Sequence, residues 1–172
     1  EDVEFDGTAA QVGCGTDFLQ LIYACRDRDL AGLEFAAGIP GSVGGAVRMN
    51  AGAYGGEIKD IVAVLRLFVP SEGFRTANKD TLGFSYRNLD LPSETIIIGA
   101  VFRMRRGDAE GIAGRVREIL AARMEKHPLE FPNAGSVFKN PRGIPAGRLI
   151  EEAGLKGIRT GDAQISEKHG NF

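Results

Sequence analysis

A run of glycines between residues 38 and 56 constrains the fold of this chain more than any other feature of the sequence. The run reads GIPGSVGGAVRMNAGAYGG and holds seven of the chain's 24 glycines. A glycine inside a helix or strand costs roughly 0.5–1 kcal/mol relative to alanine, so a packed domain keeps this many only where the backbone turns sharply or closely approaches another group. Backbone N–H groups in such a run are typical of a cradle for phosphate or another anion. We therefore expect this run to line a ligand site.

The spacing of these glycines argues against the common nucleotide-binding loops. Their order is GxxGxxGG, which matches neither the dinucleotide fingerprint GxGxxG nor the phosphate loop GxxxxGK followed by Ser or Thr. A glycine-rich surface loop without a ligand is the plain alternative. The apolar residues Val43, Ala46 and Val47, together with the placement of Asn50 and Tyr54, favour a ligand site instead.

The composition predicts a globular chain without a general affinity for nucleic acid or membranes. Of its 172 residues, 43% are hydrophobic and 26% charged, enough for one medium domain or two small ones with a core. The net charge of −2 gives no electrostatic reason to bind nucleic acid or an anionic membrane surface. We see no apolar run long enough to span a membrane, no signal peptide and no metal-ligand spacing. Cys14 and Cys25 are expected to be reduced core thiols.

The first half of the sequence predicts a helix followed by two strands. The segment TDFLQLIYACRDRDL predicts an amphipathic helix with Thr16 as its N-cap. Its apolar positions recur at helical spacing: Phe18, Leu21, Ile22 and Cys25. The β-branched runs at 61–70 and 94–105 predict strands, and 71–93 between them reads as a loop.

The second half predicts two helices and the start of a strand. Residues 107–128 carry apolar side chains on one face, at Ile112, Val116, Ile119 and Leu120. Residues 145–154 begin with proline and end with glycine, as a short helix does. Residues 162–172 predict a strand entry, and a domain boundary is expected near Gly107. The sequence shows no internal repeats.

Because the chain opens without methionine and stops within this expected strand, we expect a fragment of a longer protein.

Four motifs occur in a fixed order along nearly the whole chain: GLEFAAGIPGSVGGAVRMNAGAYGGEI, FSYRN, NAGSVFKNP and AGRLIEEAGLKGIRTGDAQISEKHGNF. Together they resemble the UDP-N-acetylenolpyruvoylglucosamine reductase family, the flavoproteins of peptidoglycan precursor synthesis. The resemblance implies an α+β fold of the vanillyl-alcohol-oxidase type. Residues 1–106 then correspond to the second FAD-binding subdomain and 107–172 to a truncated α/β substrate-binding domain. The resemblance also implies a cytoplasmic, monomeric enzyme.

The resemblance implies a two-stage reaction. NADPH reduces FAD, and the flavin then gives hydride to the β-carbon of an enolpyruvyl ether on a UDP-sugar. By likeness of NAGSVFKNP, Ser136 protonates the α-carbon; general acid catalysis is worth typically about 10²–10⁴-fold. By likeness of FSYRN, Arg87 holds the substrate carboxylate and stabilises the developing charge. A catalytic glutamate that the family carries near its C-terminus has no match in this chain.

The resemblance also implies two sets of binding residues. The FAD set is Gly38, Ile39, Pro40, Gly41, Gly44, Gly45, Ala46, Asn50 and Gly52. The nucleotide-sugar set is Tyr54, Arg123, Lys126, Lys139, Asn140 and His169. A tyrosine-bearing loop that some members insert before NAGSVF has no room here, so the chain resembles the shorter subtype.

Each of these assignments has a structural alternative. Ser136 suits a turn, and Arg87 suits a surface ion pair. Lys139 and Asn140 are common turn residues. Cations such as Arg123 and Lys126 are favoured at a helix C-terminus by the helix dipole alone.

The histidines and the function itself also have alternatives. His169 is equally suited to a structural role, and His127 is assigned one. The other function hypotheses are a different FAD-dependent oxidoreductase of the same fold, and a non-catalytic fragment that binds a nucleotide sugar.

Overall fold

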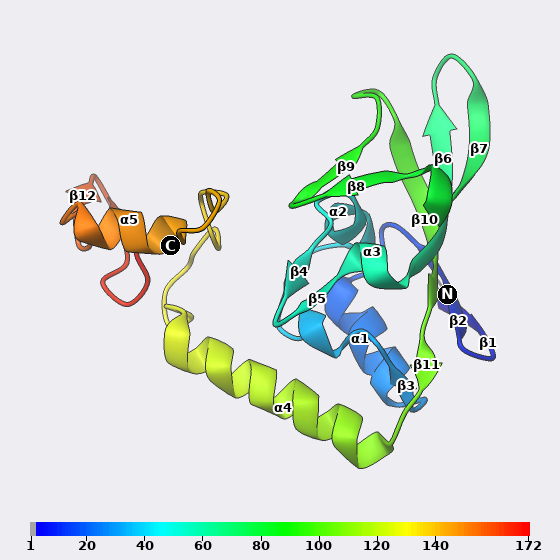
Figure 1. Cartoon of the computed structure of the whole chain (residues 1–172), viewed down its shortest axis with the longest axis horizontal. Coiled ribbons are helices and arrows are strands. Elements are labelled where there is room, and N and C mark those ends of the chain that lie inside the picture. Colours follow the sequence, from blue (N-terminus) through cyan, green and yellow to red (C-terminus); the bar gives the residue numbers. More distant parts are fainter. Residues whose placement is uncertain (1–2) are drawn as a thin grey trace. The chain divides into compact units, whose positions relative to one another are not determined.

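The computed structural model describes residues 3–172 and divides the chain into two compact units, Glu1–Ile119 and Leu120–Phe172 (Figure 1). Helix α4 (Ala109–Lys126) contributes residues to both. The predicted division between residues 106 and 107 concerns subdomains of a family and stays a prediction. Within residues 3–172, none of the helices has the length and apolar character needed to cross a membrane.

An antiparallel five-stranded sheet forms the centre of the first unit, in the order β1-β2-β10-β6-β7. The two β-branched runs supply its inner strands β6 and β10, so both predicted strands are confirmed. The bounds of the strands are β1 (Val3–Asp6), β2 (Ala9–Gly13), β6 (Val62–Val69), β7 (Gly73–Asn78) and β10 (Ile96–Arg103).

Helix α1 (Phe18–Arg26) confirms the predicted amphipathic helix, because Phe18, Leu21, Ile22 and Cys25 are all buried. Its predicted N-cap was wrong by one residue. Asp17 is the cap, and its side chain accepts a hydrogen bond from Gln20 N at 3.0 Å. Thr16 is buried instead, and its backbone carbonyl accepts a hydrogen bond from Val43 N.

Several short elements complete the first unit. Helix α2 packs against β2 and β10 (Figure 1). Its buried side chains join the same core as those of α1. The elements are β3 (Leu30–Ala31), η1 (Glu34–Ala36), α2 (Val43–Arg48), β4 (Gly52–Ala53), β5 (Gly56–Glu57), α3 (Ile58–Ile61) and β11 (Arg105–Arg106).

The segment 71–93 is not the predicted loop. It contains β7, η2 (Lys79–Thr81), β8 (Gly83–Ser85) and β9 (Asn88–Asp90). Strand β7 is held by pairing with β6 along its whole length, while most of its side chains face solvent, so it lacks the apolar alternation by which a strand is recognised. Strands β8 and β9 form a hairpin whose turn carries Tyr86 and Arg87.

The second unit contains the end of α4, helix α5 (Ala146–Glu152) and a pair of two-residue strands, β12 (Arg159–Thr160) and β13 (Ala163–Gln164). The short helix is confirmed, with Pro145 as N-cap and Gly154 in the left-handed region at φ 69°. The expected strand at 162–172 is limited to β13. The residues after it form turns, in which Ser166 N donates to Phe172 O.

Candidate functional site

The glycine run folds as a turn followed by the short helix α2. Gly38 and Gly41 have positive φ angles of 78° and 112°, which only glycine adopts readily. Ser42 then caps α2, its Oγ accepting from Gly45 N at 3.2 Å. The N–H of Val43 donates to Thr16 O, and that of Gly44 to Cys14 O, both at 2.9 Å. These first-turn N–H groups therefore already donate within the protein.

Two glycines of the run are required by packing. A Cβ on Gly44 would lie 3.0 Å from the Cβ of Cys14, and one on Gly52 would lie 2.6 Å from Gly56 O. By contrast, nothing lies within 4 Å of the Cβ direction of Gly41 or Gly15. Some glycines of this region thus permit close packing, and others leave open space.

The open space at Gly15 adjoins a hollow of ≈ 480 Å³ beside the start of α2. Its wall is mostly backbone and small side chains, with one cation, Arg48, whose guanidinium donates to the carbonyls of Leu89 and Leu91. The lining residues are Cys14, Gly15, Ser42, Gly44, Gly45, Arg48, Thr95, Ile97 and Ile98. Of the predicted FAD set, only Gly44 and Gly45 belong to this lining.

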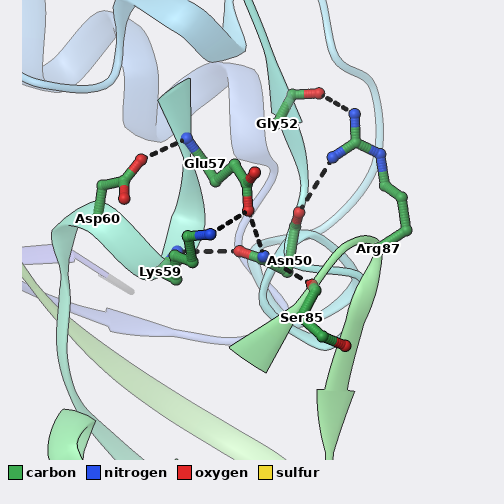
Figure 2. Close-up of polar contacts among 7 residues, drawn as sticks. All are labelled: Asn50, Gly52, Glu57, Lys59, Asp60, Ser85 and Arg87. Atoms are coloured by element: carbon green, nitrogen blue, oxygen red, sulfur yellow. Dashed lines mark hydrogen bonds and ion pairs between the residues drawn. The ribbon is translucent and has the colours of Figure 1, made fainter. Parts of the chain in front are cut away.

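Asn50 lies at the centre of a polar network that joins three parts of the first unit (Figure 2). Its side chain is fully buried. The Nδ2 group donates to Glu57 Oε2 at 2.6 Å and to Ser85 O at 2.9 Å, while Oδ1 accepts from Lys59 N at 3.0 Å. All the hydrogen-bonding capacity of its amide nitrogen is therefore used by the protein.

Arg87 belongs to the same network through backbone carbonyls. Its guanidinium donates to Asn50 O at 3.4 Å and to Gly52 O (Figure 2). It also lies 4.9 Å from the centre of the Tyr86 ring. Within residues 3–172 the structure gives Arg87 no carboxylate at ion-pair distance, so the predicted catalytic cation is oriented by neutral carbonyl groups.

Tyr54 lines a second hollow of ≈ 480 Å³ in the first unit. The Tyr54 backbone is in the left-handed region at φ 49°, and its carbonyl accepts a 3.5 Å hydrogen bond from Arg115. Gly55, Gly56, Arg105 and Arg115 are among the other lining residues.

The second unit carries a hollow of ≈ 300 Å³ that gathers three of the predicted residues, Ser136, Asn140 and His169. Asn140 Oδ1 accepts from Ala146 N at 2.9 Å and so bonds the start of α5. Lys139, Arg123 and Lys126 are not among the lining residues. The full lining is Ser136, Asn140, Pro145, Gly147, Arg148, Glu151, Lys156, Lys168, His169, Gly170 and Asn171.

The position of Ser136 depends on a residue that the sequence analysis did not single out. The side chain of Asn171, only 4% exposed, pairs with both backbone groups of Phe138, and Val137 N donates to Asn171 O at 3.0 Å. Asn171 thereby holds the segment that follows Ser136. The only sign of this role in the sequence is that Asn171 belongs to HGNF, the end of the last of the four motifs.

Both histidines lie in the second unit, and their rings form a cluster with Phe172. Burial is the main cause that lowers the pKa of His127, and Arg123 and His169 lower it further. Burial also lowers the pKa of His169, whose Nδ1 accepts the N–H of Asn171 at 3.2 Å. Neutral His169 therefore carries its proton on Nε2.

Cys14 and Cys25 are free, buried thiols, as predicted. Burial raises the pKa of Cys14 to about 11 and that of Cys25 to about 12. Neither is a reactive thiolate near neutral pH. The part of the chain that the structure describes holds no group of three or more His, Cys, Asp or Glu side chains arranged for a metal ion.

Two family models match separate parts of the chain. The family model of the FAD binding domain matches residues 1–76. The family model of the UDP-N-acetylenolpyruvoylglucosamine reductase C-terminal domain matches residues 127–172. The antiparallel sheet and these two matches define the class as α+β proteins with an FAD-binding domain.

The chain is also similar to reductases over nearly its whole length. It is 53% identical to UDP-N-acetylenolpyruvoylglucosamine reductase of Syntrophus aciditrophicus, over 94% of this chain and 52% of the relative. It is 43% identical to that of Enterococcus faecalis, over 100% of this chain and 58% of the relative. The crystal structure of the reductase from Thermus caldophilus matches with a TM-score of 0.86 at 40% identity, over 98% of this chain and 62% of that one.

The chain belongs to the UDP-N-acetylenolpyruvoylglucosamine reductase family. The predicted family and the α+β fold class are therefore confirmed. The chain spans about half the length of the curated relatives it matches.

Proposed function

We propose that this chain is part of an FAD-dependent reductase that uses NADPH to convert UDP-N-acetylglucosamine enolpyruvate to UDP-N-acetylmuramate. This step belongs to peptidoglycan precursor synthesis, and the proposed enzyme works as a monomer in the cytoplasm. The hollow of the second unit carries the proposal, because it gathers Ser136, Asn140 and His169, each selected from the sequence for this reaction. The names and identities of the relatives support it.

The proposed organisation assigns residues 1–106 to the second FAD-binding subdomain and 107–172 to the substrate-binding domain. The hollow beside α2 fits part of an FAD molecule. Its wall of backbone and small side chains allows a flat group to approach closely, and Arg48 supplies a positive charge for a diphosphate. Gly15 leaves open space there that a side chain would fill. When bound, FAD supplies the hydride that it takes from NADPH.

The residues proposed to hold FAD are those predicted from the family: Gly38, Ile39, Pro40, Gly41, Gly44, Gly45, Ala46, Asn50 and Gly52. For Asn50 the proposed contact is through the backbone, because its buried side chain already donates to Glu57 and Ser85. The residues proposed to hold the nucleotide sugar are Tyr54, Arg123, Lys126, Lys139, Asn140 and His169.

Arg87 is proposed to bind the carboxylate of the enolpyruvyl group. Reduction at the β-carbon leaves negative charge on the α-carbon and its carboxylate, so a fixed cation there stabilises the transition state more than the ground state. The guanidinium is suited to this role because two neutral carbonyls orient it and no carboxylate within residues 3–172 forms an ion pair with it. A guanidinium also matches a carboxylate in shape.

Ser136 is proposed to donate its Oγ proton to the α-carbon, which completes the reduction of the double bond. A hydroxyl is a weak acid, but the acceptor is strongly basic, so position matters more than acidity. The hydrogen bonds that join Asn171 to Val137 and Phe138, which we call the Asn171 clamp, fix the backbone beside this hydroxyl. A hydroxyl held at an exposed edge of the hollow is accessible to a substrate bound in it.

The test is an absorption spectrum of the full-length protein, followed by anaerobic addition of NADPH and then of the enolpyruvyl UDP-sugar. We expect a yellow protein that bleaches with NADPH and regains its colour with the enol ether. Recovery of colour with an alcohol or lactone substrate instead would favour another oxidoreductase of the fold. A protein that stays colourless after FAD is offered but binds the nucleotide sugar would favour a binding module.

A further inference from the structure

Glu57 is a charged residue to which neither the family resemblance nor the proposed mechanism assigns a role. It lies at the end of β5, opposite Gly52 in the register of the β4–β5 pair. Its side chain is 29% exposed and pairs with Lys59 at 3.2 Å. The 2.6 Å hydrogen bond from Asn50 Nδ2 ends on the same carboxylate oxygen (Figure 2). Glu57 is thus the only ionised partner of the buried Asn50 side chain within residues 3–172.

We propose that Glu57 is a positioning residue for Arg87 and acts through Asn50. This inference rests on the proposed function, because it assigns Arg87 to the substrate carboxylate. Asn50 supplies one of the two carbonyls that orient the guanidinium, and Gly52, two residues later, supplies the other. The Asn50 amide also binds Ser85 O, in the hairpin that carries Arg87. Fixing Asn50 therefore fixes both the acceptors of Arg87 and its own hairpin.

The backbone of this network needs such an anchor. Asn50 and Arg87 both lie in the left-handed region, at φ 40° and 52°, which side-chain-bearing residues rarely adopt. A buried amide that holds two backbone segments is effective only if its own donors are satisfied, and a charged acceptor makes the stronger hydrogen bond. Glu57 provides that acceptor without placing a carboxylate on Arg87 itself, so the positive charge stays available to the substrate.

Glu57 also has a purely structural role, which supplies a matched control. It caps α3 in a reciprocal capping box: its side chain accepts from Asp60 N, and Asp60 Oδ2 accepts from Glu57 N at 2.9 Å. The Asp60→Ala variant loses half of that box but keeps the contact between Glu57 and Asn50. Glu57→Ala loses the other half of the box, the ion pair with Lys59 and the contact with Asn50. An effect that appears in Glu57→Ala and not in Asp60→Ala therefore does not come from damage to the capping box alone.

The experiment measures the two half-reactions separately in the full-length FAD-loaded protein. We expect Glu57→Ala to slow flavin reoxidation by the enolpyruvyl substrate by about tenfold to a hundredfold, as a small misplacement of a catalytic group does. Flavin reduction by NADPH should stay within about twofold, and Asp60→Ala should leave both rates within about twofold. Glu57→Gln keeps an oxygen acceptor for Asn50 and should remain much closer to the wild-type rate than Glu57→Ala.

A double-mutant cycle separates action through Arg87 from any other effect. In an Arg87→Lys background, Glu57→Ala should change reoxidation by less than about twofold, because the group that it positions is already lost. Equal slowing of both half-reactions, or the same slowing in the Arg87→Lys background, would overturn the positioning role.

A spectroscopic readout tests the inference independently of turnover. In the NMR spectrum of the wild type, the hydrogen bonds to Asn50 O and Gly52 O should slow rotation of the Arg87 Nη groups, so that their protons give separate signals. In Glu57→Ala these groups should rotate faster, and their proton signals should merge into an average. Averaged signals in the wild type, or unchanged signals in Glu57→Ala, would overturn the inference. A wild-type protein whose flavin the enol ether cannot reoxidise would refute the proposed function, while these spectra would still decide the positioning.

Discussion

The side chain of Asn171 hydrogen-bonds both backbone groups of Phe138, with Oδ1 accepting from N–H and Nδ2 donating to C=O, each at 2.9 Å. The backbone carbonyl of Asn171 also accepts from Val137 N at 3.0 Å. One residue near the end of the chain thus mimics a neighbouring strand for the segment that follows Ser136. Ser136 carries the hydroxyl proposed to protonate the substrate. The backbone beside it is fixed by a side chain 35 positions later in the sequence.

Replacing Asn171 should loosen this segment. In Asn171→Ala, two hydrogen bonds to Phe138 are lost from a side chain that is nearly fully buried, and we expect the free energy of unfolding to fall by about 1–3 kcal/mol. Amide hydrogen exchange should show the loss of protection at Phe138. The exposed Gln164→Ala is the control and should change little. Equal protection of Phe138 in the wild type and Asn171→Ala would show that the clamp does not hold in solution.

Ser136→Ala tests the proton-donor role directly. In the full-length protein we expect NADPH to reduce the flavin at the wild-type rate, while reoxidation by the enol ether slows by about 10²–10⁴-fold, the usual contribution of a general acid. Ser93→Ala, which removes an exposed hydroxyl that bonds Glu94, serves as the control. Stopped-flow absorbance at the flavin band measures both steps. Equal losses in both half-reactions would rule out a specific role for Ser136 in protonation.

The sequence predicted the elements whose own side chains are buried, such as α1, β6 and β10. It missed β7 because that strand is stabilised by its hydrogen bonds to β6 and exposes most of its side chains. It placed the N-cap of α1 at Thr16 rather than Asp17 because two adjacent residues both suit a cap, and only the hydrogen bond from Gln20 N to the Asp17 side chain decides between them.

The candidate site was predictable to a similar extent. The motifs selected Ser136, Asn140 and His169, which line one hollow. They did not reveal that Asn50 uses its amide within the protein, or that Glu57 supports it. Those contacts join residues 7 and 35 positions apart, and neither local propensity nor hydrophobic periodicity contains such information. Partners of this kind emerge only when tertiary structure brings separate hairpins together.

Gly44 and Gly15 should respond differently to the same substitution. A Cβ on Gly44 would meet the Cβ of Cys14 at 3.0 Å and its carbonyl oxygen at 3.1 Å, so Gly44→Ala must shift α2 away from β2. We expect the free energy of unfolding to fall by about 1–3 kcal/mol, as overpacking of a core does. Denaturant unfolding measures this.

Gly15→Ala is the matched variant, because nothing lies within 4 Å of its added Cβ and the methyl group enters the hollow beside α2. We expect unchanged stability but weaker retention of FAD, measured by flavin release from the full-length protein. A stable Gly44→Ala would contradict the packing argument. Full FAD retention by Gly15→Ala would place the flavin elsewhere.

The second unit should lose stability as the pH falls below about 6.5. Burial and nearby cations lower the pKa of His127, and burial lowers that of His169, both from an ordinary value of 6.5. Below that value the unfolded state therefore binds more protons than the folded state, and stability falls with decreasing pH. The His127 contribution is complete above pH 6.5 and is lost as the pH falls through the folded pKa. The Nδ1 atom of His127 is buried without a hydrogen-bond partner within residues 3–172, so protonation there finds no acceptor.

The measurement is amide hydrogen exchange in the second unit between pH 8 and about pH 5, corrected for the intrinsic exchange rate. Wild-type protection should decrease over the lower part of this range, and His127→Gln should show a shallower decrease because one of the two titrating rings is gone. The first unit contains neither histidine and serves as an internal reference. The same pH dependence in His127→Gln and the wild type would show that the ring is not held in its neutral form. Greater protection at low pH would mean that the folded state stabilises the charged ring, opposite to the direction that burial imposes.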